Sequence, residues 1–158
     1  MENLNLIPIS GMIQRIERVQ NECCQQMITV RNADGITRLI ISADTFVIDT
    51  VRLRLGMQIT AFYDGNFPVP LIFPPQYRAV IVGRSRPNET IYVGYFDENL
   101  LSADGTLQLN PSQTTEIVMS NGQSFTCPVG NQVLVVYYSV TTRSIPPQTT
   151  PRKMIVMC

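Results

Sequence analysis

The chain has 158 residues, of which 44% are apolar and 15% are charged. Twelve basic residues balance twelve acidic ones, so the formal net charge is zero and gives no electrostatic reason to expect binding to nucleic acid or to a membrane surface. The chain has no histidine and its four cysteines lack CxxC spacing, which excludes the usual zinc sites, and we expect neither a metal nor a cofactor. No run approaches the eighteen apolar residues that a membrane span requires.

The basic residues are almost all arginine, because Lys153 is the single lysine. Lysine usually guards exposed strand edges, whereas arginine tolerates partial burial and interfaces. A neutral surface also favours self-association. We therefore expect the chain to bind copies of itself, as a homo-oligomer or a filament.

The first part of the chain predicts antiparallel strands. Residues 4–9 (LNLIPI) are expected to be extended, and Pro8 restricts them to a sheet edge. Residues 11–19 predict a long bent strand, because the helix-like spacing of their apolar positions comes without a helix cap. Two further strands, 26–32 and 37–42, flank the hairpin turn Ala33-Asp34-Gly35.

A proline-rich loop dominates the middle of the chain. Before it come a short connection at 44–49, an alternating segment at 51–55 that would place Arg52 and Arg54 on one face of a strand, and a strand at 57–63. The loop itself, 64–75 (DGNFPVPLIFPP), contains four prolines and two phenylalanines and is too apolar for an ordinary solvent loop, so we expect it to pack on something. The continuous apolar run at 77–83 (YRAVIVG) predicts a strand buried on both faces.

Two pairs of similar segments indicate an internal duplication. GMQITAFYD at 56–64 is echoed by GNQVLVVYY at 130–138, and Ala33-Asp34-Gly35 is echoed by Ala103-Asp104-Gly105. The offset is 70 residues between the hairpins and 74 between the later strands, and an extra turn at 120–123 accounts for the difference. The prediction is a first repeat at 1–77 and a second at 78–158, with the strand 78–86 shared by both.

Each repeat is read as a first strand, two strands joined by the Ala-Asp-Gly hairpin, a short connection, a strand that begins at glycine, a long loop and a last strand. This order resembles the OB-fold. The resemblance implies an all-β protein of two tandem five-stranded OB-like Greek-key barrels packed as one unit. A β-sandwich is the alternative, because the connection at 44–49 is short for the helix that usually plugs such a barrel.

OB-folds bind oligosaccharides or single-stranded nucleic acid on strands two and three and on neighbouring loops. Transferred by position, this ligand-binding face would contain Arg31, Arg38, Phe67, Phe73, Arg78, Tyr92, Tyr95, Arg143 and Arg152. The same residues also have a structural interpretation. Phenylalanines in a proline-rich loop usually close a barrel end, and arginines on outer strand faces are usually solvated or paired with acids.

Two segments, PLIFPPQYRAVIV at 70–82 and TTRSIPPQTTPRKMIVM at 141–157, resemble small uncharacterised proteins of spore-forming Firmicutes. This resemblance carries no activity over to the chain. The first ten residues lack the features of a secretory signal, so we expect synthesis in the cytoplasm, with a surface or spore-associated location left open.

No catalytic pattern stands out, and we expect the protein not to be an enzyme. The chain has no histidine base, no glycine-rich phosphate loop and no evident carboxylate pair, and turn geometry explains Asp34 and Asp104. The leading hypothesis is a structural subunit that acts by self-assembly or protein interaction. The alternative is an OB-type module for an oligosaccharide or single-stranded nucleic acid, and the neutral chain makes nucleic acid the less expected ligand.

Two features are candidates for self-assembly. The segments 4–9 and 153–157 are apolar and strand-like, so each either adds to the sheet of a neighbouring copy or completes its own. The cysteines are either reduced thiols or cross-links between copies, and the candidates for cross-linking are Cys23, Cys24 and Cys158.

Overall fold

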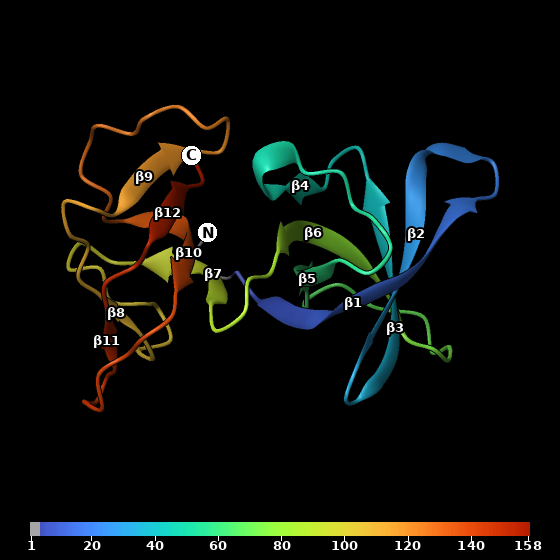
Figure 1. Ribbon diagram of the computed structural model, residues 1–158, viewed down its shortest axis with the longest axis horizontal. Helices are drawn as coiled ribbons and strands as arrows, with labels where there is room; N and C mark the ends of the chain where they lie inside the picture. Colours follow the sequence, from blue (N-terminus) through green and yellow to red (C-terminus); the bar gives the residue numbers. More distant parts are fainter. Residues whose placement is uncertain (1–3) are drawn as a thin grey trace. The chain divides into compact units, whose positions relative to one another are not determined.

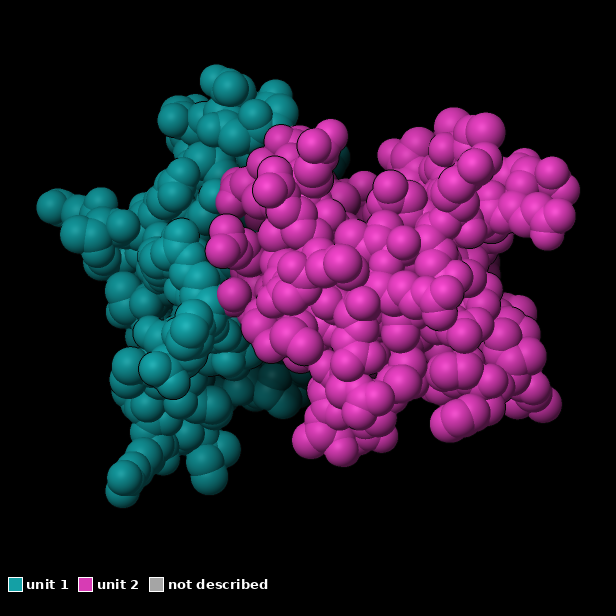
Figure 2. Space-filling view, turned by 45° about the vertical axis from the view of Figure 1, so that its right-hand side comes forward, with its two compact units in different colours: residues 1–4, 86–158 teal, residues 5–85 magenta. Residues whose placement is uncertain are grey.

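The computed structural model describes residues 4–158 and is all-β, as predicted (Figure 1). Its internal contacts define an N-terminal unit, Asn5–Ser85, and a C-terminal unit that contains Arg86–Cys158 (Figure 2). The division follows the strand β6 (Gln76–Arg84), whereas the sequence suggested a boundary at residue 77. The recorded pairings of β6 are with strands of the N-terminal unit, and its sharing with a second repeat stays a prediction.

A six-stranded sheet forms the N-terminal unit. Besides β6, its strands are β1 (Leu6–Val19), β2 (Glu22–Asn32), β3 (Gly35–Ser42), β4 (Phe46–Val47) and β5 (Gln58–Asp64), with one turn of 3-10 helix at Ile48–Thr50. The strand order is β3-β2-β1-β5-β6-β4, and a parallel pairing of β3 with β6 closes a ring of hydrogen bonds. The ring is not a true barrel.

Several predicted elements are confirmed in this sheet. The predicted bent strand is part of β1, which has a register shift between Ile13 and Arg15 and curves along its length (Figure 1). Pro8 lies in the part of β1 that pairs with β5 alone, because the pairing of β1 with β2 begins only at Met12. The predicted hairpin joins β2 to β3, and Gly35 there has a φ of 125°, a conformation that favours glycine.

The core of the N-terminal unit is built from alternate residues of the five strands in the ring. Side chains alternate across a strand, so about every second residue faces inward. Ile13, Ile28, Leu39, Ile59 and Val82 come one from each strand, and none is more than 1% exposed. Full burial of one such side chain stabilises a fold by roughly 1.5–3 kcal/mol. The inward faces of the five strands therefore supply the core. The prediction that the strand at 77–83 is buried on both faces is wrong, because Arg78 and Val80 of β6 are exposed.

The alternating segment at 51–55 does not form the strand that a shared face for Arg52 and Arg54 would require. Residues 51–54 have no strand, and Arg52 and Arg54 are exposed in irregular chain. Backbone hydrogen bonds to β1 begin only at Gly56, whose N–H donates to Ile13 O at 2.8 Å, and at Met57, whose O accepts from Ile13 N at 2.9 Å. Exposure alternates from Val51 to Arg54 as the sequence pattern predicts, with both arginines exposed, but no neighbouring strand pairs with this segment.

The C-terminal unit contains a four-stranded sheet and a two-stranded parallel pair. The sheet has the order β7 (Thr90–Phe96), β10 (Gln132–Tyr138), β12 (Lys153–Val156) and β9 (Glu116–Met119), and the pair consists of β8 (Gln108–Leu109) and β11 (Gln148–Thr149). Single bridges from Phe96 to Ser102 and from Leu101 to Gln108 connect β7 to β8. The core here contains Phe96, Leu107, Leu109, Leu134, Val136, Met154 and Val156.

Both predicted donor segments pair within their own chain. Residues 6–12 of β1 pair with β5, and β12 lies between β10 and β9 with all four of its residues buried. Of the two alternatives for these segments, completion of their own sheets is the one that the structure has.

A threonine ties the turn after β3 to the last strand of the N-terminal unit. Thr45 N donates to Ser42 O at 3.1 Å, and Ser42 N donates to Thr45 Oγ1 at 3.0 Å. The same hydroxyl donates to Ala79 O of β6 at 2.8 Å. This one side chain therefore serves both the turn and the sheet.

The C-terminal unit has the same three hydrogen bonds 70 positions later in the chain, at Ser112 and Thr115. Their lengths are 3.1 Å and 3.0 Å within the turn and 2.7 Å from Thr115 Oγ1 to Pro151 O, just before β12. Thr115 is 9% exposed, so its hydroxyl has little access to water as a substitute partner. Loss of the hydroxyl should therefore leave the buried Pro151 O and the part-buried Ser112 N without this hydrogen bond.

We expect Thr115→Val to lower the free energy of unfolding by about 1–3 kcal/mol, because it leaves Ser112 N and Pro151 O without this partner. The exposed neighbour Thr114 is the matched control, and Thr114→Val should change stability by less than about 0.5 kcal/mol. Urea denaturation followed by circular dichroism measures both. Equal effects of the two substitutions would contradict the structural role of Thr115.

Candidate functional site

The loop between β5 and β6 exposes most of its apolar side chains. Phe67 is 70% exposed and Phe73 is 93% exposed, and Val69, Leu71 and Ile72 are exposed as well. These side chains therefore find no cover within their own chain, and the expectation that the loop packs on something stays a prediction about a partner. The four prolines of the loop fix their own φ and lack an N–H, which limits the hydrogen bonds that could fold the loop inward.

Contacts at both stems hold this loop in place. The rings of Tyr63 on β5 and Tyr77 on β6 stack with centroids 3.9 Å apart and planes at 14°. Burial, and then the contact with Tyr77, raise the pKa of Tyr63. At the far end Pro75 O accepts a hydrogen bond from Arg38 N at 2.9 Å. The apolar side chains are therefore presented outward from a fixed base.

Three of the predicted arginines lie on one face of the N-terminal sheet. The register pairs Thr29 with Arg38, Arg31 with Ile36 and Ile40 with Arg78, and paired residues share a face. Leu39 points into the core, so this arginine face, Arg31, Arg38 and Arg78, is the outer one. Among the described residues none of the three forms a salt bridge, and Arg38 Nε is buried without a hydrogen-bond partner.

In the C-terminal unit, Tyr92 is held by internal contacts. Tyr92 Oη donates to Asp104 Oδ2 at 3.0 Å, and burial together with this carboxylate raises the pKa of Tyr92 to about 12. Burial alone would raise the pKa of Asp104, but hydrogen bonds from Ser102, Thr106 and Tyr92 lower it to about 2. The pair therefore serves as a support for the hairpin at Asp104.

The other predicted residues of this unit do not gather at one place. Arg152 binds Glu89 through two hydrogen bonds of 2.8 Å and 2.9 Å and lies 5.0 Å from the centre of the Tyr137 ring, and the bonds to Glu89 raise its pKa. Tyr95 donates to Asn131 at 3.3 Å. Arg143 is exposed in the loop after β10.

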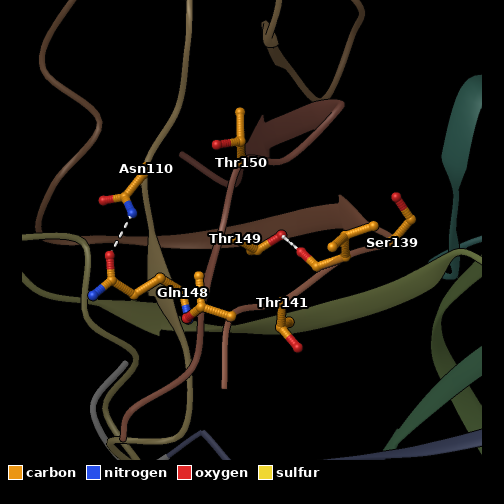
Figure 3. A pocket seen from close by; sticks show the side chains of 8 residues that line it. Asn110, Ser139, Thr141, Gln148, Thr149 and Thr150 are labelled. Carbon is orange, nitrogen blue, oxygen red and sulfur yellow. Dashed lines mark hydrogen bonds between the residues drawn. The ribbon is translucent and has the colours of Figure 1, made fainter. Parts of the chain in front are cut away.

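A hollow of about 430 Å³ lies in the C-terminal unit (Figure 3). Its lining carries no ionisable side chain and consists of Asn110, Ser139, Val140, Thr141, Thr142, Gln148, Thr149 and Thr150. Our sequence analysis did not predict these residues. The available signal was the threonine pairs at 141–142 and 149–150, but threonine pairs are also common in strands and loops.

All four cysteines are free and exposed. Cys23 and Cys24 are adjacent on β2, close to its hairpin with β1, so their side chains point to opposite faces. Cross-linking through Cys23, Cys24 or Cys158 stays a prediction. Within residues 4–158 no group of three or more metal-binding side chains is present, and no helix is long and apolar enough to cross a membrane.

We expect Asp104→Asn to lower the free energy of unfolding near neutral pH by about 1 kcal/mol, after allowance for solvent screening. The pKa of Asp104, about 2 in the fold, lies below the ordinary value of 3.8, so its carboxylate stabilises the fold above about pH 4. That contribution is lost as the pH falls through about 2. The variant should therefore lose less stability than the parent chain over this range.

Urea denaturation at a series of pH values measures this effect. Asp34→Asn, at the matching position of the other hairpin, is the control, because the carboxylate of Asp34 has no hydrogen-bond partner in the described part of the chain. The control should follow the parent chain from pH 4 to 2. Parallel pH profiles of Asp104→Asn and the parent would contradict the assignment.

No protein-family model matches the chain, and no curated protein does. Three surfaces of the protein are candidates for binding a partner or a ligand. They are the apolar loop, the arginine face and the hollow, and each belongs to a single unit.

Proposed function

We propose that the protein is a non-enzymatic structural subunit that binds copies of itself through the loop Phe67–Phe73. The observation that carries this proposal is the exposure of five large apolar side chains within seven residues. Contiguous exposed apolar surface of this kind marks protein interaction sites, because its burial against a partner releases it from water. The prolines favour binding further, since a loop whose prolines have a fixed φ loses less conformational freedom when it docks.

A second copy of the chain is the partner that best fits the surface chemistry. The formal net charge is zero, so copies of the chain do not repel one another. The single lysine, Lys153, is only 8% exposed and therefore leaves the sheet edges without the usual lysine protection. The exposed thiols Cys23, Cys24 and Cys158 are the places where we expect covalent cross-links between copies under oxidising conditions.

The proposal also includes a finer description of the fold, in which both units derive from one OB-like unit by duplication. The shared hydrogen bonds of Thr45 and Thr115 support this origin. The parallel strand pairs support it as well. Arg38 pairs with Gln76 in the N-terminal unit, and Gln108 pairs with Gln148 in the C-terminal unit. Gln108 follows Arg38 by 70 positions, and Gln148 follows Gln76 by 72. The ring of hydrogen bonds in the N-terminal unit favours an OB-like order over a β-sandwich.

We expect the parent chain to associate as its concentration rises, and the double variant Leu71→Ser/Phe73→Ser to stay monomeric with an unchanged circular dichroism spectrum. The reason is that both side chains lie outside the core, so the change removes adhesive surface without loss of packing. Sedimentation velocity over a range of protein concentrations measures the result.

The matched control is Leu55→Ser, because Leu55 is 66% exposed in the same unit but lies outside this loop. This control should associate like the parent. A parent chain that is monomeric at every concentration would refute self-assembly. Association of the double variant at parental strength would refute the role of the loop.

The arginine face supports a second candidate function, an OB-type module for an oligosaccharide or single-stranded nucleic acid. Three guanidinium groups without acidic partners favour phosphate oxygens, so nucleic acid is the ligand to test at this face. We expect Arg38→Gln to weaken binding of a fluorescent oligothymidine by about tenfold, measured by anisotropy, if this candidate holds. Arg52→Gln, at an exposed position off the face, is the control. Absence of salt-sensitive binding by the parent eliminates the candidate.

A further inference from the structure

We propose that the hollow in the C-terminal unit is a binding site for a neutral polyhydroxylated ligand, an oligosaccharide. Three segments form it, namely the chain after β10, the chain around β11 and Asn110 after β8 (Figure 3). The proposal is independent of the loop Phe67–Phe73, because every lining residue belongs to the C-terminal unit.

The frame of the hollow is held by hydrogen bonds between the three segments. Asn110 N donates to Thr149 O at 2.8 Å, and Thr142 N donates to Gln148 O at 2.9 Å. Gln148 N donates in return to Thr142 Oγ1 at 2.9 Å, and Thr149 Oγ1 donates to Val140 O at 2.6 Å. The backbone around the hollow is thus fixed before a ligand arrives, which reduces the entropy cost of binding.

The polar side-chain groups at the hollow that make no hydrogen bond within the described part of the chain include donors and acceptors. The hydroxyls of Ser139, Thr141 and Thr150 have no hydrogen-bond partner in the described part of the chain. Asn110 Nδ2 donates to Gln148 Oε1 at 2.8 Å, and this bond leaves Gln148 Nε2 as a donor and Asn110 Oδ1 as an acceptor (Figure 3). A ligand hydroxyl, which is itself donor and acceptor, matches such a set.

The absence of charge in the lining selects the class of ligand. An anionic ligand would find no lining cation to pair with, which gives phosphates and carboxylates no advantage over neutral ligands here. An apolar ligand would find only Val140 and threonine methyl groups to pack on. All lining residues except Thr149 are exposed, so the groups are within reach of a ligand from solvent. The volume of about 430 Å³ falls in the range of small-molecule sites.

The test is a titration of the full-length protein, labelled with nitrogen-15, followed by NMR. The probes are maltotriose, cellotriose and tri-N-acetylchitotriose at millimolar concentrations, and oligothymidine serves as the anionic comparison. We expect at least one neutral probe to shift the amide signals of residues 110, 139–142 and 148–150, and oligothymidine to leave these signals unchanged. No shift with any neutral probe, or shifts that lie elsewhere, would overturn the proposal.

Single substitutions then locate the contacts. Thr141→Val and Thr150→Val keep the side-chain shape and remove hydroxyls that bond to nothing in the protein, so each should weaken binding by about two- to tenfold without loss of stability. Gln148→Glu keeps an acceptor for Asn110 but removes the amide donor and adds a negative charge, so binding should fall further. Thr90→Val, on an exposed position of β7, should bind like the parent.

Parental affinity in Thr141→Val, Thr150→Val and Gln148→Glu would also overturn the proposal. The variant Leu71→Ser/Phe73→Ser separates this site from self-assembly, because it should lose association and keep the oligosaccharide-induced shifts. Coupled loss of both properties in that variant would contradict an independent site in the C-terminal unit.

Discussion

The parallel pairing of β3 with β6 is the constraint on which the N-terminal unit depends. It joins two strands that are far apart in sequence and closes the ring of hydrogen bonds around Ile28, Leu39 and Val82. It also fixes where the long loop ends, because Arg38 N on β3 donates to Pro75 O directly before the pairing begins. The loop is therefore anchored by the same contact that closes the sheet.

The C-terminal unit also contains a parallel pairing, which is shorter and forms a separate two-stranded sheet. Gln108 N donates to Pro147 O at 3.0 Å, and the parallel pair of β8 with β11 follows at once. In both units a proline-proline-glutamine sequence enters the parallel pairing, at 74–76 and at 146–148. A loop of different composition precedes each proline pair. The first has the apolar sequence FPVPLIF, and the second has the mixed sequence SVTTRSI, which combines hydroxyl side chains with the exposed Val140 and Ile145. The N-terminal unit thus presents an apolar loop, and the C-terminal unit presents a hydroxyl-lined hollow.

The residues predicted from the OB-fold resemblance divide in a similar way between the units. Arg31, Arg38 and Arg78 share an outer face without acidic partners among the described residues. In contrast, Tyr92 and Arg152 are engaged by Asp104 and Glu89 of their own unit. The OB-fold resemblance predicts where on the strands a binding residue lies, but it does not show whether that residue already has a partner in the protein. The two units differ because Asp104 and Glu89 lie beside the predicted residues of the C-terminal unit, and the resemblance does not predict the positions of these acids.

Local chemistry in the sequence determined the all-β class, the hairpin at Gly35, the bent strand β1 and the position of the proline-rich loop, because turns and alternating patterns act over a few residues. Tertiary structure decided the rest. Residues 51–54 are not a strand because no neighbour pairs with them, and Phe73 is exposed because the stacked Tyr63 and Tyr77 hold the loop outside the core. The hollow joins Asn110 to threonines more than thirty positions away. Such long-range contacts depend on which strands meet, and no local pattern encodes that choice.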